Sequence, residues 1–189
     1  MKMSEFRLAW VNYEVSIMIK GAILSDDRQY RYSLWRIWDE TKEPVVFIGL
    51  NPSTADESED DSTIRRCIDF AESWGYGGIY MLNLFAYRTK EPKIMKSMDD
   101  PVGPDFLKYF AAHVSLVSTV VVAWGNHGEF QDRANEVLDL IMDNYNVRCF
   151  GLNKNKTPKH PLYLKGTTPL MKYDPTESEP DASSIRLLA

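Results

Sequence analysis

The chain has 189 residues, of which 44% are hydrophobic and 26% are charged, as in ordinary globular proteins. Its formal net charge of −5 gives no global attraction to nucleic acid, and no apolar run approaches the length of a membrane span. The two cysteines, Cys67 and Cys149, are too few for an iron–sulfur cluster or a four-thiolate zinc site. We therefore expect a cytoplasmic protein with reduced thiols, no cofactor and no membrane contact.

Two β-prone runs, residues 13–24 and 30–38, flank the turn formers at 25–27 and predict a hairpin. We expect this hairpin at an edge of a sheet or over one of its faces. In the second run, alternating apolar side chains are expected on one side of the strand: Tyr30, Tyr32, Leu34 and Ile37. Two charged residues, Arg31 and Arg36, interrupt this pattern.

Short apolar runs further along the chain predict three buried strands, at about 45–48, 79–82 and 119–124, and a short fourth strand at 148–151. Between them, apolar residues spaced by three and four predict helices that begin near Ser62, Pro104 and Glu129. This alternation predicts an α/β fold: a three-layer α/β/α domain with a central four-stranded, mostly parallel sheet, plus the N-terminal hairpin. We expect one domain over residues 1–173 and a flexible tail at 174–189, where Pro, Ser and acids dominate.

Polar residues follow the predicted strands at the edge where the carboxyl ends of parallel strands meet. Side-chain amides there suit the recognition of a planar heterocycle, because each has both a donor and an acceptor. An aromatic residue nearby would stack on the ring, with Phe85, Tyr87 or Trp74 as candidates. The polar set is Asn51, Ser53 and Thr54 after the first buried strand, Asn83 after the second, His127 after the third, and His160 in a basic loop.

Four segments resemble, in the same order, the motifs of the uracil-DNA glycosylase superfamily: GLNPS, YMLNLFAYR, VVVAWGNHGE and KHPLYL. The stretch from residue 31 to 170 resembles a bacterial and phage family known as DUF1643. Its hallmarks here are GLNPSTAD, DDSTIRRC, WGYGG, NLFAYR, AWGNHG and KHPLYL. The ordered set points to the fold more strongly than any single motif does.

The resemblance implies a role for each matching residue. Asn51 would position an attacking water, Asn83 would read the base, and His160 would face the base oxygen where negative charge develops. Leu162 or Tyr163 would fill the gap left by a flipped nucleotide. Further contacts with phosphates or nucleic acid would come from Ser53, Thr54, Arg65, Arg88, Lys159 and Thr167, with Asp56, Asp61 and His127 elsewhere on the rim.

The sequence departs from the superfamily at the first motif, where Asn51 replaces the water-activating aspartate of the most active glycosylases. The leading expectation is a nucleobase-recognising protein that hydrolyses an N-glycosidic bond in DNA or a nucleotide. An alternative is a non-catalytic module that binds a nucleobase or nucleic acid. A second alternative is a metal-dependent phosphoester hydrolase that uses Asp56, Asp60 and Asp61, although their spacing matches no known metal loop and we expect no metal.

Overall fold

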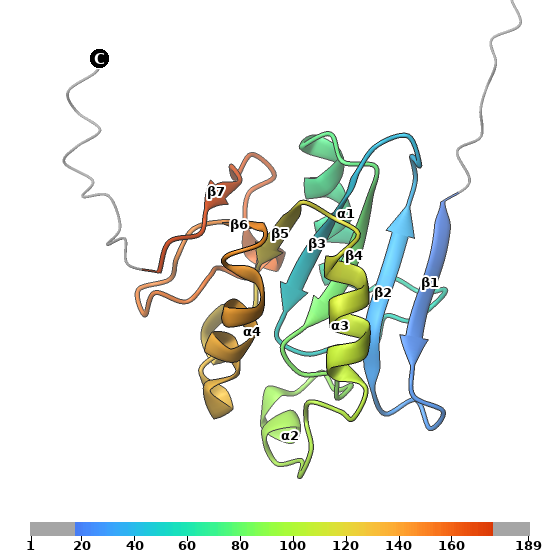
Figure 1. The fold of residues 1–189 in the computed structure, drawn as a ribbon, viewed down its shortest axis with the longest axis vertical. Coiled ribbons are helices and arrows are strands. Elements are labelled where there is room, and N and C mark those ends of the chain that lie inside the picture. The colour runs from blue at the N-terminus through green and yellow to red at the C-terminus, as the bar shows by residue number, and fades with distance from the viewer. Residues whose placement is uncertain (1–17, 176–189) are drawn as a thin grey trace, which may run out of the picture.

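Seven strands form one mixed sheet in the computed structural model, which describes residues 18–175 (Figure 1). Their spatial order is β1-β2-β4-β3-β5-β6-β7. Strands β3 to β6 run parallel to one another, whereas β1, β2 and β7 pair antiparallel at the two sides. The strands are β1 (Ile19–Leu24), β2 (Arg31–Ile37), β3 (Pro44–Gly49), β4 (Gly78–Asn83), β5 (Thr119–Val122), β6 (Asn146–Cys149) and β7 (Met171–Lys172).

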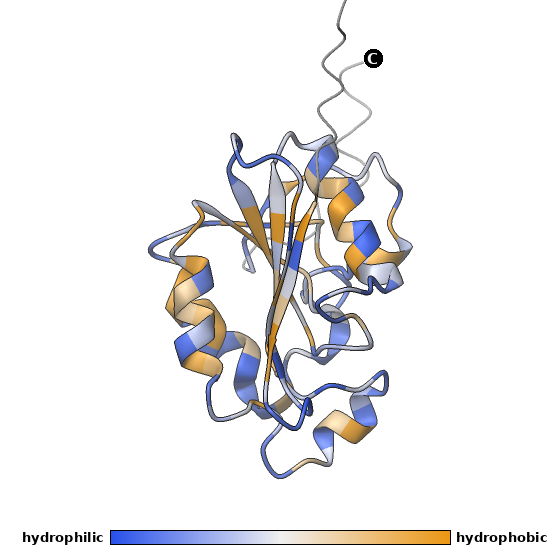
Figure 2. Ribbon diagram, turned by 90° about the vertical axis from the view of Figure 1, so that its right-hand side faces the viewer, coloured by the Kyte–Doolittle hydropathy of each residue, from blue (hydrophilic) through white to orange (hydrophobic). Residues whose placement is uncertain are grey.

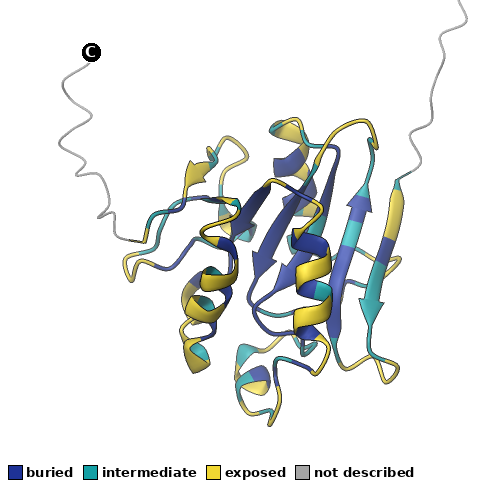
Figure 3. Cartoon of the chain, in the orientation of Figure 1, coloured by how far each residue is buried: buried dark blue, intermediate teal, exposed yellow. Residues whose placement is uncertain are grey.

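Helices pack on both faces of the sheet (Figure 2). On one face, α1 buries Ile64, Cys67 and Ala71 against alternate residues of the parallel strands. On the other face, α3 and α4 bury a second apolar cluster against the remaining strand residues. The three central parallel strands, β3, β4 and β5, are accordingly almost wholly buried, whereas β6 has one exposed and one half-buried residue (Figure 3). The helices are α1 (Ser62–Ser73), α2 (Pro92–Lys96), α3 (Phe106–Val114) and α4 (Arg133–Ile141), with 3₁₀ turns η1 (Gly125–His127), η2 (Phe130–Asp132) and η3 (Pro161–Tyr163).

The predicted mixed α/β class is confirmed, but the sheet is larger than the sequence indicates. The hairpin of β1 and β2 extends the same sheet through the pairing of β2 with β4, so it lies at an edge and covers neither face. The two-residue β7, for which the sequence pattern predicts no strand, pairs with β6. Helix α4 begins at Arg133 and not near Glu129, because Gln131 and Asp132 have φ values of 55° and 57° that interrupt the helix.

The expected alternation along β2 is wrong because the strand contains a bulge. Ile23 pairs with Ser33 and Leu24 pairs with Arg31, so Tyr32 has no partner in β1 and the side chains before it change face. The Tyr32 ring therefore packs against Tyr109 of α3, while Leu34 joins the cluster under α1. Both arginines of the strand are buried on the α1 side, where they bind the loop that follows β3; these are Arg31 and Arg36.

The order of the parallel strands locates the position where this type of sheet binds ligands. The chain passes from β3 outward to β4, then crosses back to β5 on the other side of β3 and continues to β6. The connections after β3 and β5 therefore leave in opposite directions, and such a switch point opens a crevice at the carboxyl ends of the strands.

Two further expectations concern the end of the chain and contact with a membrane. Most of the expected flexible tail, like the first 17 residues, lies outside the described residues. Within residues 18–175, no helix has both the length and the apolar character needed to cross a membrane.

Candidate functional site

A cavity of about 1040 Å³ lies at the carboxyl ends of β3, β4 and β5. The first turn of α1 and the segment around η3 complete its wall. Most of the residues predicted from the strand ends and the basic loop contribute to this one wall: Asn51, Ser53, Thr54, Asp61, Arg65, Asn83, His127, Lys159, His160, Leu162 and Tyr163.

Asn83 ends β4 and is the most buried of the predicted polar residues, with 3% of its surface exposed. Its neighbour across the strands is Gly49, and a Cβ atom at Gly49 would lie 2.9 Å from the Asn83 Oδ1 atom. The absence of a side chain at Gly49 therefore leaves room for the amide. Nδ2 of Asn83 has no hydrogen-bond partner among residues 18–175, an exception among buried polar groups.

Asn51 connects two loops of the cavity through its side-chain amide. Nδ2 donates to the backbone carbonyl oxygens of Pro52 at 3.1 Å, Tyr87 at 3.4 Å and Thr89 at 2.8 Å. The loop after β3 is thereby tied to the loop after β4. Oδ1 accepts no hydrogen bond from the described part of the chain, so it is the atom of this side chain left for a ligand or water.

His160 precedes η3 and caps it with its ring. Nδ1 accepts a hydrogen bond from the backbone N–H of Leu162 at 3.3 Å, so a neutral ring carries its proton on Nε2. Burial lowers the pKa of His160 below its usual 6.5, and the charge of Asp61 partly opposes this shift. At neutral pH the ring is therefore an uncharged hydrogen-bond donor in the cavity wall.

The lowered pKa of His160 predicts a specific loss of stability in mild acid. As pH falls below 6.5, the unfolded chain binds a proton at this histidine before the folded chain does. We expect the free energy of unfolding to fall until the pH reaches the lowered folded-state pKa, below which this group contributes no further change. Denaturant unfolding of the wild type and His160→Gln between pH 8 and pH 5 measures the effect. Parallel pH profiles of the two proteins would contradict it.

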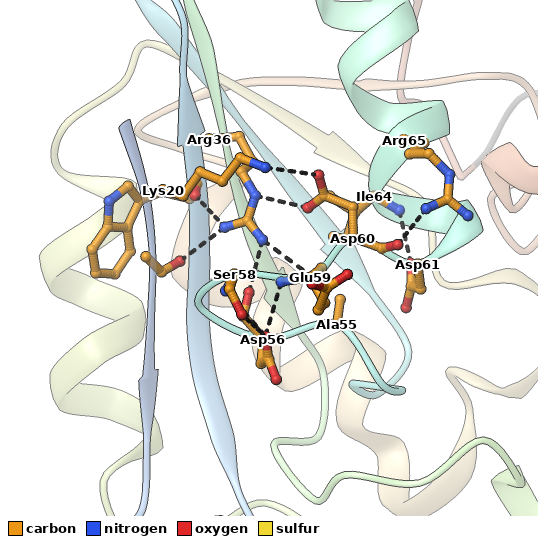
Figure 4. Close-up of polar contacts among 12 residues, drawn as sticks. Lys20, Arg36, Ala55, Asp56, Ser58, Glu59, Asp60, Asp61, Ile64 and Arg65 are labelled. Atoms are coloured by element: carbon orange, nitrogen blue, oxygen red, sulfur yellow. Dashed lines mark hydrogen bonds and ion pairs between the residues drawn. The ribbon is translucent and has the colours of Figure 1, made fainter. Parts of the chain in front are cut away.

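The acidic loop after β3 is held by Arg36, whose side chain is fully buried (Figure 4). Its Nε donates to Asp60 at 2.7 Å, and its Nη2 donates to the backbone carbonyls of Asp56 at 2.7 Å and Glu59 at 3.4 Å. The Asp56 carboxylate accepts from backbone N–H groups inside its own turn, and Asp61 accepts from Ile64 to cap α1. These acids thus form the framework of the loop, and nowhere in residues 18–175 do three or more His, Cys, Asp or Glu side chains form a group suited to a metal ion.

Arg31 also belongs to the cavity, a position that the sequence did not indicate. Its side chain is 2% exposed, and Nη1 donates to the Ala55 carbonyl at 2.9 Å. Nε of Arg31 has no partner among the described residues. Burial lowers the pKa of Arg31 to about 10, with Asp61 acting in the opposite direction, so the guanidinium stays charged at neutral pH.

The expected aromatic wall is wrong. Phe85 is fully buried in the core against Phe130, because backbone hydrogen bonds of Leu84 and Phe85 to Gly49 and Leu50 continue the strand pairing beyond β4. Instead, Trp124 and Tyr163 are the aromatic residues in the cavity wall, and Tyr163 is 90% exposed. Four other candidates also lie away from the wall and have partners elsewhere: Tyr87 against Tyr30, Trp74 against Phe70, Arg88 on the Arg28 carbonyl, and Asp56 in its turn.

Comparison with known proteins gives one match. The sequence model of the family described as "Protein of unknown function (DUF1643)" matches residues 31–162. Neither the curated proteins nor the solved structures contain a significant match. The matched region begins at β2 with the buried Arg31 and ends within η3, so it includes most of the cavity wall. More than half of the chain is covered, and the chain therefore belongs to the DUF1643 family.

Proposed function

We propose that the protein recognises a nucleobase, carried by a nucleotide or a nucleic acid, in the cavity at the carboxyl ends of the strands. The observation that carries the proposal is the buried Asn83 amide, whose Nδ2 has no partner within residues 18–175. Buried polar groups are nearly always satisfied, so a ligand that completes this amide accounts for it. A base edge offers an adjacent donor and acceptor, which match the oxygen and nitrogen of an amide.

Hydrolysis of the N-glycosidic bond is the reaction that we propose for this site. A water oxygen bonds to the anomeric carbon, and the carbon–nitrogen bond breaks with its electron pair leaving on the base. The sugar gains OH and the base gains H. Oδ1 of Asn51 would orient the water, since Nδ2 is held by backbone carbonyls. The neutral His160 would donate from Nε2 to the base oxygen that becomes negative, an effect worth about 10²–10³ in rate for oxyanion donors.

The proposal includes the finer fold class, a three-layer α/β/α domain of the uracil-DNA glycosylase type. Its support is that the four segments resembling the motifs of that superfamily contribute to one cavity. Asn51, Asn83, Gly125 and His160, one residue from each segment, all belong to its wall. Segments separated by more than 100 residues thus meet where a base would bind.

A two-part experiment tests the proposal. Side-chain amide NMR signals of Asn83, assigned by their absence in Asn83→Ala, are followed while free nucleobases and nucleosides are added. We expect one base to shift these signals downfield. Base release is then measured by chromatography from nucleosides, nucleotides and oligonucleotides that contain the same base.

Asn144→Ala is the matched control, because Asn144 is exposed near the end of α4 and away from the cavity. Binding and release should survive Asn144→Ala and disappear in Asn83→Ala. If no base in the panel shifts the Asn83 signals, the proposed recognition is wrong. If a base binds and no release follows, recognition stands and hydrolysis is wrong.

A specific observation favours non-catalytic binding as the second candidate. No carboxylate in the wall is unengaged: Asp60 pairs with Arg36, and Asp61 caps α1. Asn51 cannot act as a base. If the protein only binds its ligand, the glycosidic bond of the bound nucleoside stays intact. The measured affinity for the nucleoside should then stay the same during prolonged incubation.

A further inference from the structure

The cavity wall carries an excess of positive charge in a chain whose formal net charge is −5. Its two carboxylates are already engaged, since Asp60 is paired with Arg36 and Asp61 caps α1. Four cationic side chains contribute to the wall, and none has a carboxylate within 4.0 Å in the described part of the chain; these are Arg31, Arg65, Lys90 and Lys159. The imbalance indicates an anionic ligand.

Arg31 provides the most specific anchor for such an anion. Its Nη1 is used by the Ala55 carbonyl, while Nε and Nη2 make no hydrogen bond within residues 18–175. These two nitrogens are the adjacent pair with which a guanidinium holds two oxygens of one phosphate or carboxylate. The side chain is 2% exposed and has no carboxylate within 4.0 Å in the described part of the chain. A buried charge without a paired counter-charge is costly, so an anion bound there would stabilise it.

The first turn of α1 borders the same cavity. Ser62, Thr63 and Ile64 contribute to the wall. The Asp61 side chain accepts from the N–H of Ile64 and its backbone carbonyl from the N–H of Arg65, and no hydrogen bond within residues 18–175 uses the N–H of Ser62 or Thr63. The N–H groups of a helix N-terminus and its dipole attract anions. The 12-residue α1 thus adds a second anion receptor beside the buried Arg31.

We propose that this part of the cavity binds the phosphate of a nucleotide, held side-on by Arg31 and capped by the N-terminus of α1. Arg65 and Lys90 add charge at the same wall. The inference rests on the proposed function for the base half of the ligand. It assigns the phosphate of that ligand to Arg31 and the N-terminus of α1, and it predicts that a free nucleotide or a nucleic acid strand binds more tightly than a free base or a nucleoside.

Calorimetric titration of the full chain tests this inference with three probes that share one base: the nucleoside, its 5′-monophosphate and a single-stranded oligonucleotide. We expect the better phosphate-bearing probe to bind at least tenfold tighter than the nucleoside, and the difference to shrink as salt rises. Arg31→Met should remove that difference while nucleoside affinity is retained. Lys108→Gln, on α3 across the sheet, is the matched control and should leave all three affinities unchanged.

Arg31 is buried, so the exposed Arg65→Gln provides a second variant that keeps the fold. It should weaken the phosphate-bearing probes about threefold and leave the nucleoside unaffected. Tighter binding of the oligonucleotide identifies a strand as the source of the phosphate, and tighter binding of the monophosphate identifies a free nucleotide.

The outcomes separate the two proposals. Equal affinity for the nucleoside and both phosphate-bearing probes overturns the phosphate inference, while base recognition stands. Repeating the three titrations with a second base tests recognition of the base itself. Phosphate-dependent binding that is equal for the two bases supports the inference, while base recognition fails. Loss of nucleoside binding together with phosphate binding in a folded Arg31→Met would make Arg31 part of the base site and overturn its assignment to phosphate.

Discussion

Replacing Arg36 with leucine is expected to lower the free energy of unfolding by about 3–5 kcal/mol, the range for breaking one side of a buried ion pair. The fully buried guanidinium makes five hydrogen bonds, to the Asp60 carboxylate and to four backbone carbonyls. Leucine leaves the Asp60 carboxylate with Lys20, at 3.8 Å, as its one remaining cation among residues 18–175, and leaves the carbonyls without this donor. Urea denaturation followed by circular dichroism measures the loss.

Two comparisons identify the cause of this loss. Adding Asp60→Leu to Arg36→Leu should recover part of the lost stability, because the second change removes the stranded carboxylate. Lys42→Leu breaks an exposed ion pair with Asp39 and should cost no more than about 1 kcal/mol. An Arg36→Leu protein as stable as Lys42→Leu would mean that the acidic loop does not depend on Arg36.

The sequence predicts the central strands of the fold but not the side-chain directions in β2, the strand that carries Arg36. Apolar runs such as 45–48 and 119–122 are typical of central strands that are buried on both faces. The position of these strands and their burial therefore follow from the sequence pattern. Strand β2 differs, because a bulge at Tyr32 moves Arg31 to the α1 face, where Arg36 also lies. A single extra residue reverses the assignment of faces, and nothing local in the sequence marks it.

The same distinction holds at the cavity. Asn51, Asn83 and His160 could be predicted, since they follow buried strands or lie in a loop that resembles a known motif. Phe85 could not, because its burial follows from backbone hydrogen bonds that continue beyond β4. Arg31 could not be predicted either, because a charged residue in a strand is usually exposed, and its burial depends on the folded loop around Ala55.

At Asn83 the expected effect on stability has the opposite sign. Asn83→Leu keeps the shape of the side chain and removes a buried donor that has no partner among residues 18–175. An unsatisfied buried group costs about 1–3 kcal/mol, so the variant should unfold with an equal or higher free energy. Nucleobase binding should fall by at least about 100-fold, since a site built to hydrogen-bond a polar edge loses its partner. Urea denaturation and calorimetric titration measure the two effects on the same protein.

The combination is diagnostic because other roles for Asn83 give other results. If the amide were a structural group satisfied in solution, Asn83→Leu would destabilise the protein as Arg36→Leu does. If it bordered the cavity without contacting the ligand, stability would rise while binding stayed the same. A gain in stability that accompanies a loss of binding is the pattern of a residue kept for function at the expense of the fold, and it would assign the buried amide at the end of β4 to ligand recognition.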